Sequence, residues 1–244
     1  MLVAAAVCPC PPLLVPAVAT GAAPELDDAR AACLDALGVL AAARPDRLVV
    51  VGPEAGADPG ADGTVTYPEG AGGGFEGFGV DLDVRLGAGE ARDASGTRRL
   101  PTSLAVAAWL LQRADWADAP VEGVGVAERL APGRCAALGR DLAVRAPRVA
   151  LLVMGDGSAR RSVKAPGYLD ERAGDFDTRA ARALGAADTG ALAELDAGLA
   201  YELKAAGRAP WQVLAGAAHT ASLDGRLLYD DAPYGVGYLV AAWA

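Results

Sequence analysis

Two cysteines stand at the end of the first apolar run, in the opening MLVAAAVCPCPPLLVP, where Cys8 and Cys10 flank a proline. Two thiolates at this spacing could bind zinc or Cu(I), which favour soft ligands. No second pair of cysteines or histidines follows at ligand spacing. We therefore favour a second interpretation, in which Cys8 is buried at a strand end and Cys10 is a small residue lining a pocket. A disulfide between residues two apart would be strained.

Two carboxylates occupy comparable positions after apolar runs. Glu54 follows LVVVGP, and it could be a pocket carboxylate or a solvated loop residue. Asp156 follows the run RVALLVMG, and it could cap the next turn or face a pocket. Either carboxylate could bind a ligand or transfer a proton if the fold brings it to a site.

The stretch GDGSARR could bind an anion. Successive backbone N–H groups at Gly157 and Ser158 could form an anion-binding nest, with the guanidinium of Arg160 beside it. Two adjacent arginines can engage a carboxylate or phosphate in bidentate fashion. The alternative is that Arg160 and Arg161 form ion pairs with nearby acidic residues such as Asp156, Asp170 or Glu171.

His219 is the only histidine in the chain. It lies in the polar stretch HTASLDG, so we expect it to be exposed. A Ser-His-Asp triad would have to combine Ser158 with this one residue, which lies far away in the sequence. Asp156, Ser158 and His219 remain the candidate catalytic residues.

The three motifs follow segments that we predict to be strands. Unbroken apolar runs at 2–7, 48–51 and 148–154 indicate buried strands. In α/β sheets, ligands bind outside the carboxyl ends of parallel strands. We therefore expect Cys8, Cys10, Glu54, Gly157, Ser158 and Arg160 to lie around one pocket.

The rest of the chain alternates between strand and helix patterns. Helices are predicted from Pro24 to Pro45, from Pro101, and over 132–144, with short helical pieces over 176–218. Further strands are predicted at 80–86, 121–126, 226–229 and 236–241, and the Gly-rich stretch 55–79 is predicted to be a loop. This alternation predicts one α/β domain with a mixed sheet covered on both faces.

Composition excludes several classes of protein. The 244 residues are 52% hydrophobic, which argues against disorder, and the net charge of −9 would repel nucleic acid. No apolar stretch is long enough to span a membrane, and the prolines that follow Cys8 argue against a signal peptide. We expect a soluble cytoplasmic protein whose partner is a small molecule.

Three motifs also carry a family resemblance: CPCPPLLVP, GDGSARR and the closing YDDAPYGVGYLVA. They resemble the LigB-like group, which comprises the class III extradiol ring-cleaving dioxygenases and their Memo relatives. The resemblance spans nearly the whole chain and implies a single LigB-like α/β domain over residues 1–244. For active members it implies a non-haem Fe(II) held by a His after each of the first two strands and by a late carboxylate. A further His acts as acid and base.

The sequence departs from this pattern at each of those positions. Cys10 stands where the first His is expected, Glu54 is the nearest ligand type after the second strand, and Ala159 stands where the base is expected. A single histidine cannot provide two histidine ligands within one chain. We therefore expect no metal cofactor; if the family activity is kept, Fe(II) or another divalent ion would use Cys10, Glu54 and His219.

Three functions remain open. The favoured one is a LigB-like protein that lacks the standard iron site and keeps a pocket for a small anionic or aromatic ligand. The second is a metal-dependent ring-opening dioxygenase with an unusual set of ligands, drawn from Cys8, Cys10, Glu54, Asp156 and His219. The third is a non-catalytic interaction protein.

Overall fold

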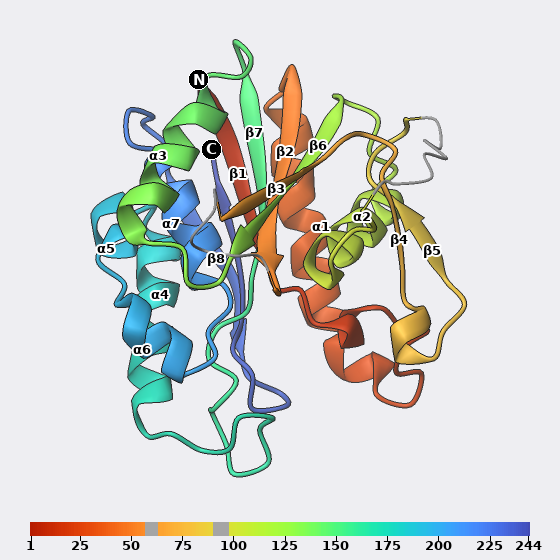
Figure 1. Cartoon of the computed structure of the whole chain (residues 1–244), viewed down its shortest axis with the longest axis vertical. Coiled ribbons are helices and arrows are strands. Elements are labelled where there is room, and N and C mark those ends of the chain that lie inside the picture. The colour runs from red at the N-terminus through yellow and green to blue at the C-terminus, as the bar shows by residue number, and fades with distance from the viewer. Residues whose placement is uncertain (57–62, 90–97) are drawn as a thin grey trace.

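A mixed seven-stranded sheet forms the centre of the fold in the computed structural model, which describes residues 1–56, 63–89 and 98–244 (Figure 1). The strand order is β3-β6-β2-β7-β1-β9-β8. The central strands β6, β2, β7 and β1 are parallel to one another, whereas β3, β9 and β8 each pair antiparallel with their neighbours. The strands of this sheet are β1 Leu2–Cys8, β2 Arg47–Glu54, β3 Thr64–Tyr67, β6 Val121–Ala127, β7 Val149–Met154, β8 Gly225–Asp231 and β9 Tyr238–Trp243.

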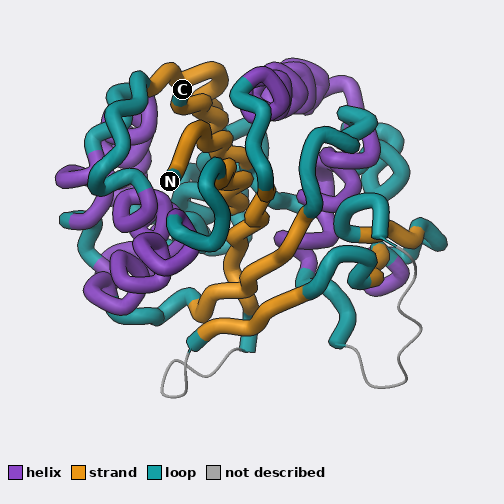
Figure 2. The backbone as a smooth tube through the Cα atoms, turned by 90° about the horizontal axis from the view of Figure 1, so that it is seen from above, coloured by secondary structure: helices purple, strands orange, loops and turns teal. Residues whose placement is uncertain are grey.

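Helices cover both faces of the sheet, as the view from above in Figure 2 shows. One core contains α1 and α2 with the strand residues Leu48 and Val50, and the other contains α3, α4 and α7 with Val49 and Val51. Successive strand residues point to opposite faces, so a run that is apolar throughout must be covered twice. The helices are α1 Asp27–Ala42, α2 Thr102–Arg113, α3 Pro132–Ala143, α4 Arg172–Gly185, α5 Thr189–Ala193, α6 Ala197–Glu202 and α7 Arg208–Ala217. The predicted α/β fold with a covered mixed sheet is confirmed.

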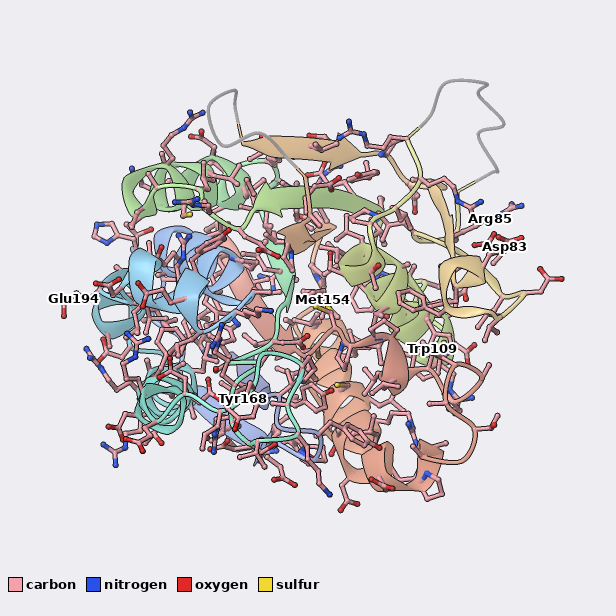
Figure 3. The ribbon with its side chains drawn as sticks, turned by 60° about the horizontal axis from the view of Figure 1, so that its bottom comes forward. Asp83, Arg85, Trp109, Met154, Tyr168 and Glu194 are labelled. Atoms are coloured by element: carbon pink, nitrogen blue, oxygen red, sulfur yellow. The ribbon has the colours of Figure 1, made fainter. Side chains whose placement is uncertain are left out.

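The central strand β7 shows why the sequence pattern is informative. All six of its residues are buried, and it pairs in parallel with β1 on one side and β2 on the other. It therefore requires apolar side chains on both faces, which the run VALLVM provides. In Figure 3, Met154 marks the end of this strand, and Tyr168 lies on the connection that follows it.

Three predicted elements are corrected by the structure. The stretch 55–79 contains β3 and the short strand β4 Gly72–Gly74, although its residues 57–62 lie outside the described part. The predicted strand 80–86 shortens to β5 Asp83–Arg85, which pairs only with β4 in a separate small sheet. The first helix begins as a 3₁₀ turn at Ala23–Leu26, before α1. The strand β4 consists of three glycines, so it shows no alternation of apolar and polar side chains from which a strand could be predicted.

Two glycines let α3 and α7 touch through their backbones. A Cβ atom on Gly139 would lie 2.0 Å from the carbonyl oxygen of Val213, and one on Gly216 would lie 2.3 Å from that of Ala136. Both helices start at the carboxyl edge of the sheet, where Arg208 donates to the carbonyl oxygen of Leu130 at 2.6 Å. Close packing of these helices therefore positions the loops at that edge.

No helix in the described ranges is long and apolar enough to cross a membrane.

Candidate functional site

The ends of β1 and β7 are joined at the carboxyl edge of the sheet. The N–H of Gly155 donates to the carbonyl oxygen of Cys8 at 3.0 Å, and the N–H of Cys10 donates to Oδ1 of Asp156 at 2.8 Å. Cys8 and Met154 are the last paired residues of the parallel strands β1 and β7. The two bonds therefore extend the pairing of these strands into the loops that follow them. The structure thus brings two sequence-predicted residues, Cys10 and Asp156, into direct contact.

Burial dominates the protonation of both groups. It raises the pKa of the Asp156 carboxyl from its ordinary value of 3.8 to about 7, although the Cys10 N–H opposes this effect and the residue as a whole is only partly buried. Burial also raises the pKa of the Cys10 thiol, and the neighbouring Asp156 adds to the increase. Cys10 is therefore a protonated thiol at neutral pH, which is a poor nucleophile.

Tyr238, at the start of β9, is a third protonatable group in this cluster. Its side chain is buried, and its pKa is raised first by that burial and then by the charge of Asp156. The neighbouring strands β7, β1 and β9 thus bring three protonatable groups together: the carboxyl of Asp156, the thiol of Cys10 and the phenol of Tyr238. Sequence reasoning did not identify Tyr238, although it belongs to the closing YGVGYLVA motif.

The stability of the protein should depend on the titration of Asp156. Because the folded pKa of about 7 exceeds the unfolded value of 3.8, the folded chain binds this proton more tightly. The free energy of unfolding should therefore fall as the pH rises from about 4 to about 7. Asp156→Asn, which mimics the protonated form, should lack this component. Urea unfolding of both proteins across that range measures it, and parallel pH profiles would contradict it.

Glu54 lies at the same edge but belongs to a different cluster. The Tyr67 hydroxyl lies 2.9 and 3.0 Å from the two carboxylate oxygens of Glu54 and donates to them. Gly125 leaves room for this contact, because a Cβ there would lie 2.1 Å from Oε2 of Glu54. The exposed Arg98 adds a cation at 3.7 Å. Glu54 therefore extends across β6 toward β3, away from β7 and β1.

The backbone of the GDGS turn is already hydrogen-bonded within the protein. The N–H of Gly157 donates to Gly237 at 2.7 Å, that of Ser158 to Oδ1 of Asp177 at 2.8 Å, and that of Arg161 to Gly235 at 2.9 Å. These N–H groups cannot also hold an external anion, so the predicted backbone nest is wrong. The turn is instead joined to the YGVGY segment.

Ser158 is a structural residue rather than a pocket residue. Its side chain is fully buried, its hydroxyl donates to the carbonyl oxygen of Leu203 at 2.9 Å, and it accepts from the N–H of Arg160 at 3.1 Å. Both bonds occupy the oxygen that a nucleophile would need. The suggested role of Ser158 in catalysis or ligand binding is therefore not supported by its position.

Asp177 on α4 is hydrogen-bonded to the GDGSARR segment and packs against Gly237 of the YGVGY segment. It accepts from the N–H of Ser158 and from Arg161, whose Nη1 lies 2.8 Å from Oδ2. A Cβ on Gly157 or Gly237 would lie 2.7 or 2.2 Å from the carboxylate oxygens of Asp177, so the glycines of both motifs make room for it. Asp177 was not identified from the sequence. An acid among the apolar positions of a helix does indicate a buried and paired carboxylate, and this pattern could have been noticed.

A cavity of about 450 Å³ opens beside this turn, at the carboxyl ends of β6 and β7. Arg160 lines it, so one of the predicted pocket residues is found in a cavity. Its other lining residues come from the loop after β6 and from the segment around the end of α6: Glu128, Ala200, Tyr201, Glu202, Lys204, Ala205 and Ala206.

His219 lies at the opposite edge of the sheet and is exposed. Gly207, directly before α7, donates its N–H to the carbonyl oxygen of Asp156 at 2.8 Å, so α7 starts at the carboxyl edge. The helix then runs back along the sheet for about 15 Å, at 1.5 Å per residue. His219 follows its end and cannot act with Asp156 or Cys10.

The residues present do not fit an iron centre. The predicted donors are separated: Cys10 lies beside Asp156 at the ends of β1 and β7, Glu54 extends toward Tyr67 on β3, and His219 lies at the far edge. Over residues 1–56, 63–89 and 98–244, no three His, Cys, Asp or Glu side chains are grouped so that they could hold a metal ion.

Comparison with known proteins identifies the fold only. A scan against protein-family models gives no match, and no curated protein matches the chain. Among solved structures, the chain is similar to the crystal structure of uncharacterized protein JW3007 from Escherichia coli K12. The TM-score is 0.55 and the sequence identity is 14%, with 99% of each chain covered.

Proposed function

We propose that the chain is a LigB-like protein that lacks the iron site of the ring-cleaving dioxygenases and binds a small organic molecule at the carboxyl edge of its sheet. The observation that carries this proposal is the cavity of about 450 Å³ beside the GDGS turn. Its volume lies within the range of small-molecule sites, and its position is where α/β sheets bind ligands.

The arrangement of the three motifs supports membership of the group. CPCPP follows β1, GDGS follows β7, and YGVGY leads into β9, so all three lie beside one another at one edge. Hydrogen bonds join the first to the second through Cys10 and Asp156, and the second to the third through Gly157 and Gly237. These contacts bring the three motifs that carry the resemblance together at the edge where α/β sheets bind ligands.

The donor set argues against iron-dependent chemistry in this member. The non-haem Fe(II) oxygenases that this chain resembles hold the ion by two imidazoles and a carboxylate on one face. Here the single histidine is remote, and the two carboxylates at the edge, Glu54 and Asp156, are held by Tyr67 and by the N–H of Cys10.

Oxygen uptake tests this proposal. The protein, loaded with Fe(II) under anaerobic conditions and then mixed with catechol or protocatechuate in air, should consume oxygen no faster than Fe(II) in buffer. Formation of a ring-cleaved product with repeated turnover would overturn the proposal and restore the dioxygenase alternative.

A further inference from the structure

Two cations of the cavity have no hydrogen-bond partners among the described residues. The guanidinium of Arg160 makes no hydrogen bond or ion pair with the described residues, and its Nε is buried without a hydrogen-bond partner. The ammonium of Lys204 is exposed and has no ion pair in the described part of the chain. Arg160 lines the cavity and its guanidinium has no acceptor among the described residues, so it is available to an acceptor that enters the cavity.

The backbone at Lys204 is unusual for a lysine. Its φ is +54°, in the left-handed region that favours glycine. The N–H of Lys204 donates to Tyr201 at 3.1 Å and that of Ala205 to Ala200 at 2.8 Å, which is the glycine-type ending of a helix. A lysine here keeps a cation at the cavity at a small conformational cost.

The acidic residues of the lining leave a positive excess. Glu202 and Asp170 share one cation, because Arg172 lies 2.9 Å from the first carboxylate and 2.7 Å from the second. With Glu128, these acids and Arg172 carry a net charge of −2, which Arg160 and Lys204 balance. Arg129, which lies over the ring of the lining residue Tyr201, adds a further cation and leaves a small positive excess. The cavity therefore favours an anion on balance.

The remaining lining is apolar. Ala200, Ala205 and Ala206 contribute methyl groups, and Tyr201 contributes a ring on which Arg129 lies at 4.5 Å from the centroid. Such a surface can pack against a flat or aliphatic body but cannot satisfy polar groups. The cations and the apolar wall thus match the two halves of an amphiphilic small molecule.

We propose that this cavity binds a small organic anion, a carboxylate or phosphate monoester on an apolar body, whose oxygens are held by Arg160 and Lys204. This inference rests on the proposed function and names the ligand class for it. Arg binds such oxygens in pairs, and Lys binds them as a point charge.

The chain offers an internal control, because it contains only two lysines, Lys164 and Lys204. Lys164 is exposed outside the cavity lining. Limited acetylation with acetic anhydride, read by peptide mass spectrometry, reports both lysines in one sample. Saturating phenyl phosphate or benzoate should reduce acetylation of Lys204 about fivefold or more and leave Lys164 unchanged, because a bound anion shields the amine it contacts.

Affinities from NMR titration of the alanine methyl signals complete the test. Phenyl phosphate or benzoate should bind at least about tenfold more tightly than neutral phenol, as expected for charge-assisted hydrogen bonds. Arg160→Gln and Lys204→Gly should each weaken binding about tenfold, and Lys164→Gln should not. Lys204→Gly suits its left-handed backbone, so its loss of affinity cannot be assigned to misfolding.

The outcomes separate this inference from the proposed function. Equal binding of phenol and phenyl phosphate would overturn the anion inference while leaving a small-molecule cavity in place. Tight binding of inorganic phosphate alone would contradict the apolar body. Binding of no probe, or equal protection of Lys164 and Lys204, would reject the inference, and oxygen uptake would then judge the proposed function separately.

Discussion

Gly139→Ala should lower the free energy of unfolding by about 3 kcal/mol, at the upper end of ordinary overpacking effects. The added Cβ would lie 2.0 Å from the carbonyl oxygen of Val213 and 2.6 Å from the backbone nitrogen of Ala217. Both neighbours are backbone atoms of α7, so no side chain can rotate away. The two helices would have to separate, and the whole contact between α3 and α7 would loosen.

The matched control is Gly133→Ala in the same helix. A Cβ on Gly133 would meet no atom within 4 Å, so this change should be neutral or stabilise the protein by up to about 1 kcal/mol through helix propensity. Urea unfolding of the three proteins, followed by circular dichroism, measures both effects. Equal stability of the two variants would show that α3 and α7 are not in close contact.

Asp177→Ala should lower the free energy of unfolding by about 3 kcal/mol, near the lower end for breaking a buried ion pair. The change leaves the N–H of Ser158 without an acceptor and removes the partner of Arg161. Asp177 is 1% exposed in its side chain, whereas Arg161 is 30% exposed, so water can partly compensate the arginine. The contact between the GDGS turn and the YGVGY segment should open first.

Asp175→Ala is the control for this prediction, because Asp175 lies on the same helix and is exposed. It should change stability by less than about 1 kcal/mol, the usual contribution of an acid in the first turn of a helix. Limited proteolysis locates the effect: cleavage near residues 232–237 should accelerate in Asp177→Ala alone. Unchanged stability of Asp177→Ala would mean that this carboxylate does not hold the GDGSARR segment in place.

The strand ends were predictable because they follow from apolar runs. Runs of four to seven apolar residues without alternation require burial on both faces, which identified β1, β2 and β7 and placed their following residues at one edge. The direction of each side chain was not predictable in this way. Glu54 extends toward Tyr67 because Gly125 leaves room for it on β6, and no local pattern around Glu54 reports that distant glycine.

The GDGS turn shows a second feature that the sequence alone could not predict, namely whether its backbone N–H groups are free. A Gly-Asp-Gly-Ser sequence suits an anion-binding nest only if its N–H groups are free, and here Asp177 and the YGVGY segment accept them. The groups that we propose to bind an anion are therefore the side chains of Arg160 and Lys204 and not the backbone N–H groups of the turn. Arg160 was predicted from the turn, but Lys204 lies 44 positions later and is brought beside it only by the packing of α6.

Iron content of the purified protein tests the central claim most directly. Cells are grown with added iron, the protein is purified under reducing conditions and dialysed, and metals are determined by elemental analysis against protein concentration. The absence of a fitting donor set predicts well under one equivalent of iron. Stoichiometric iron that survives dialysis would contradict the account.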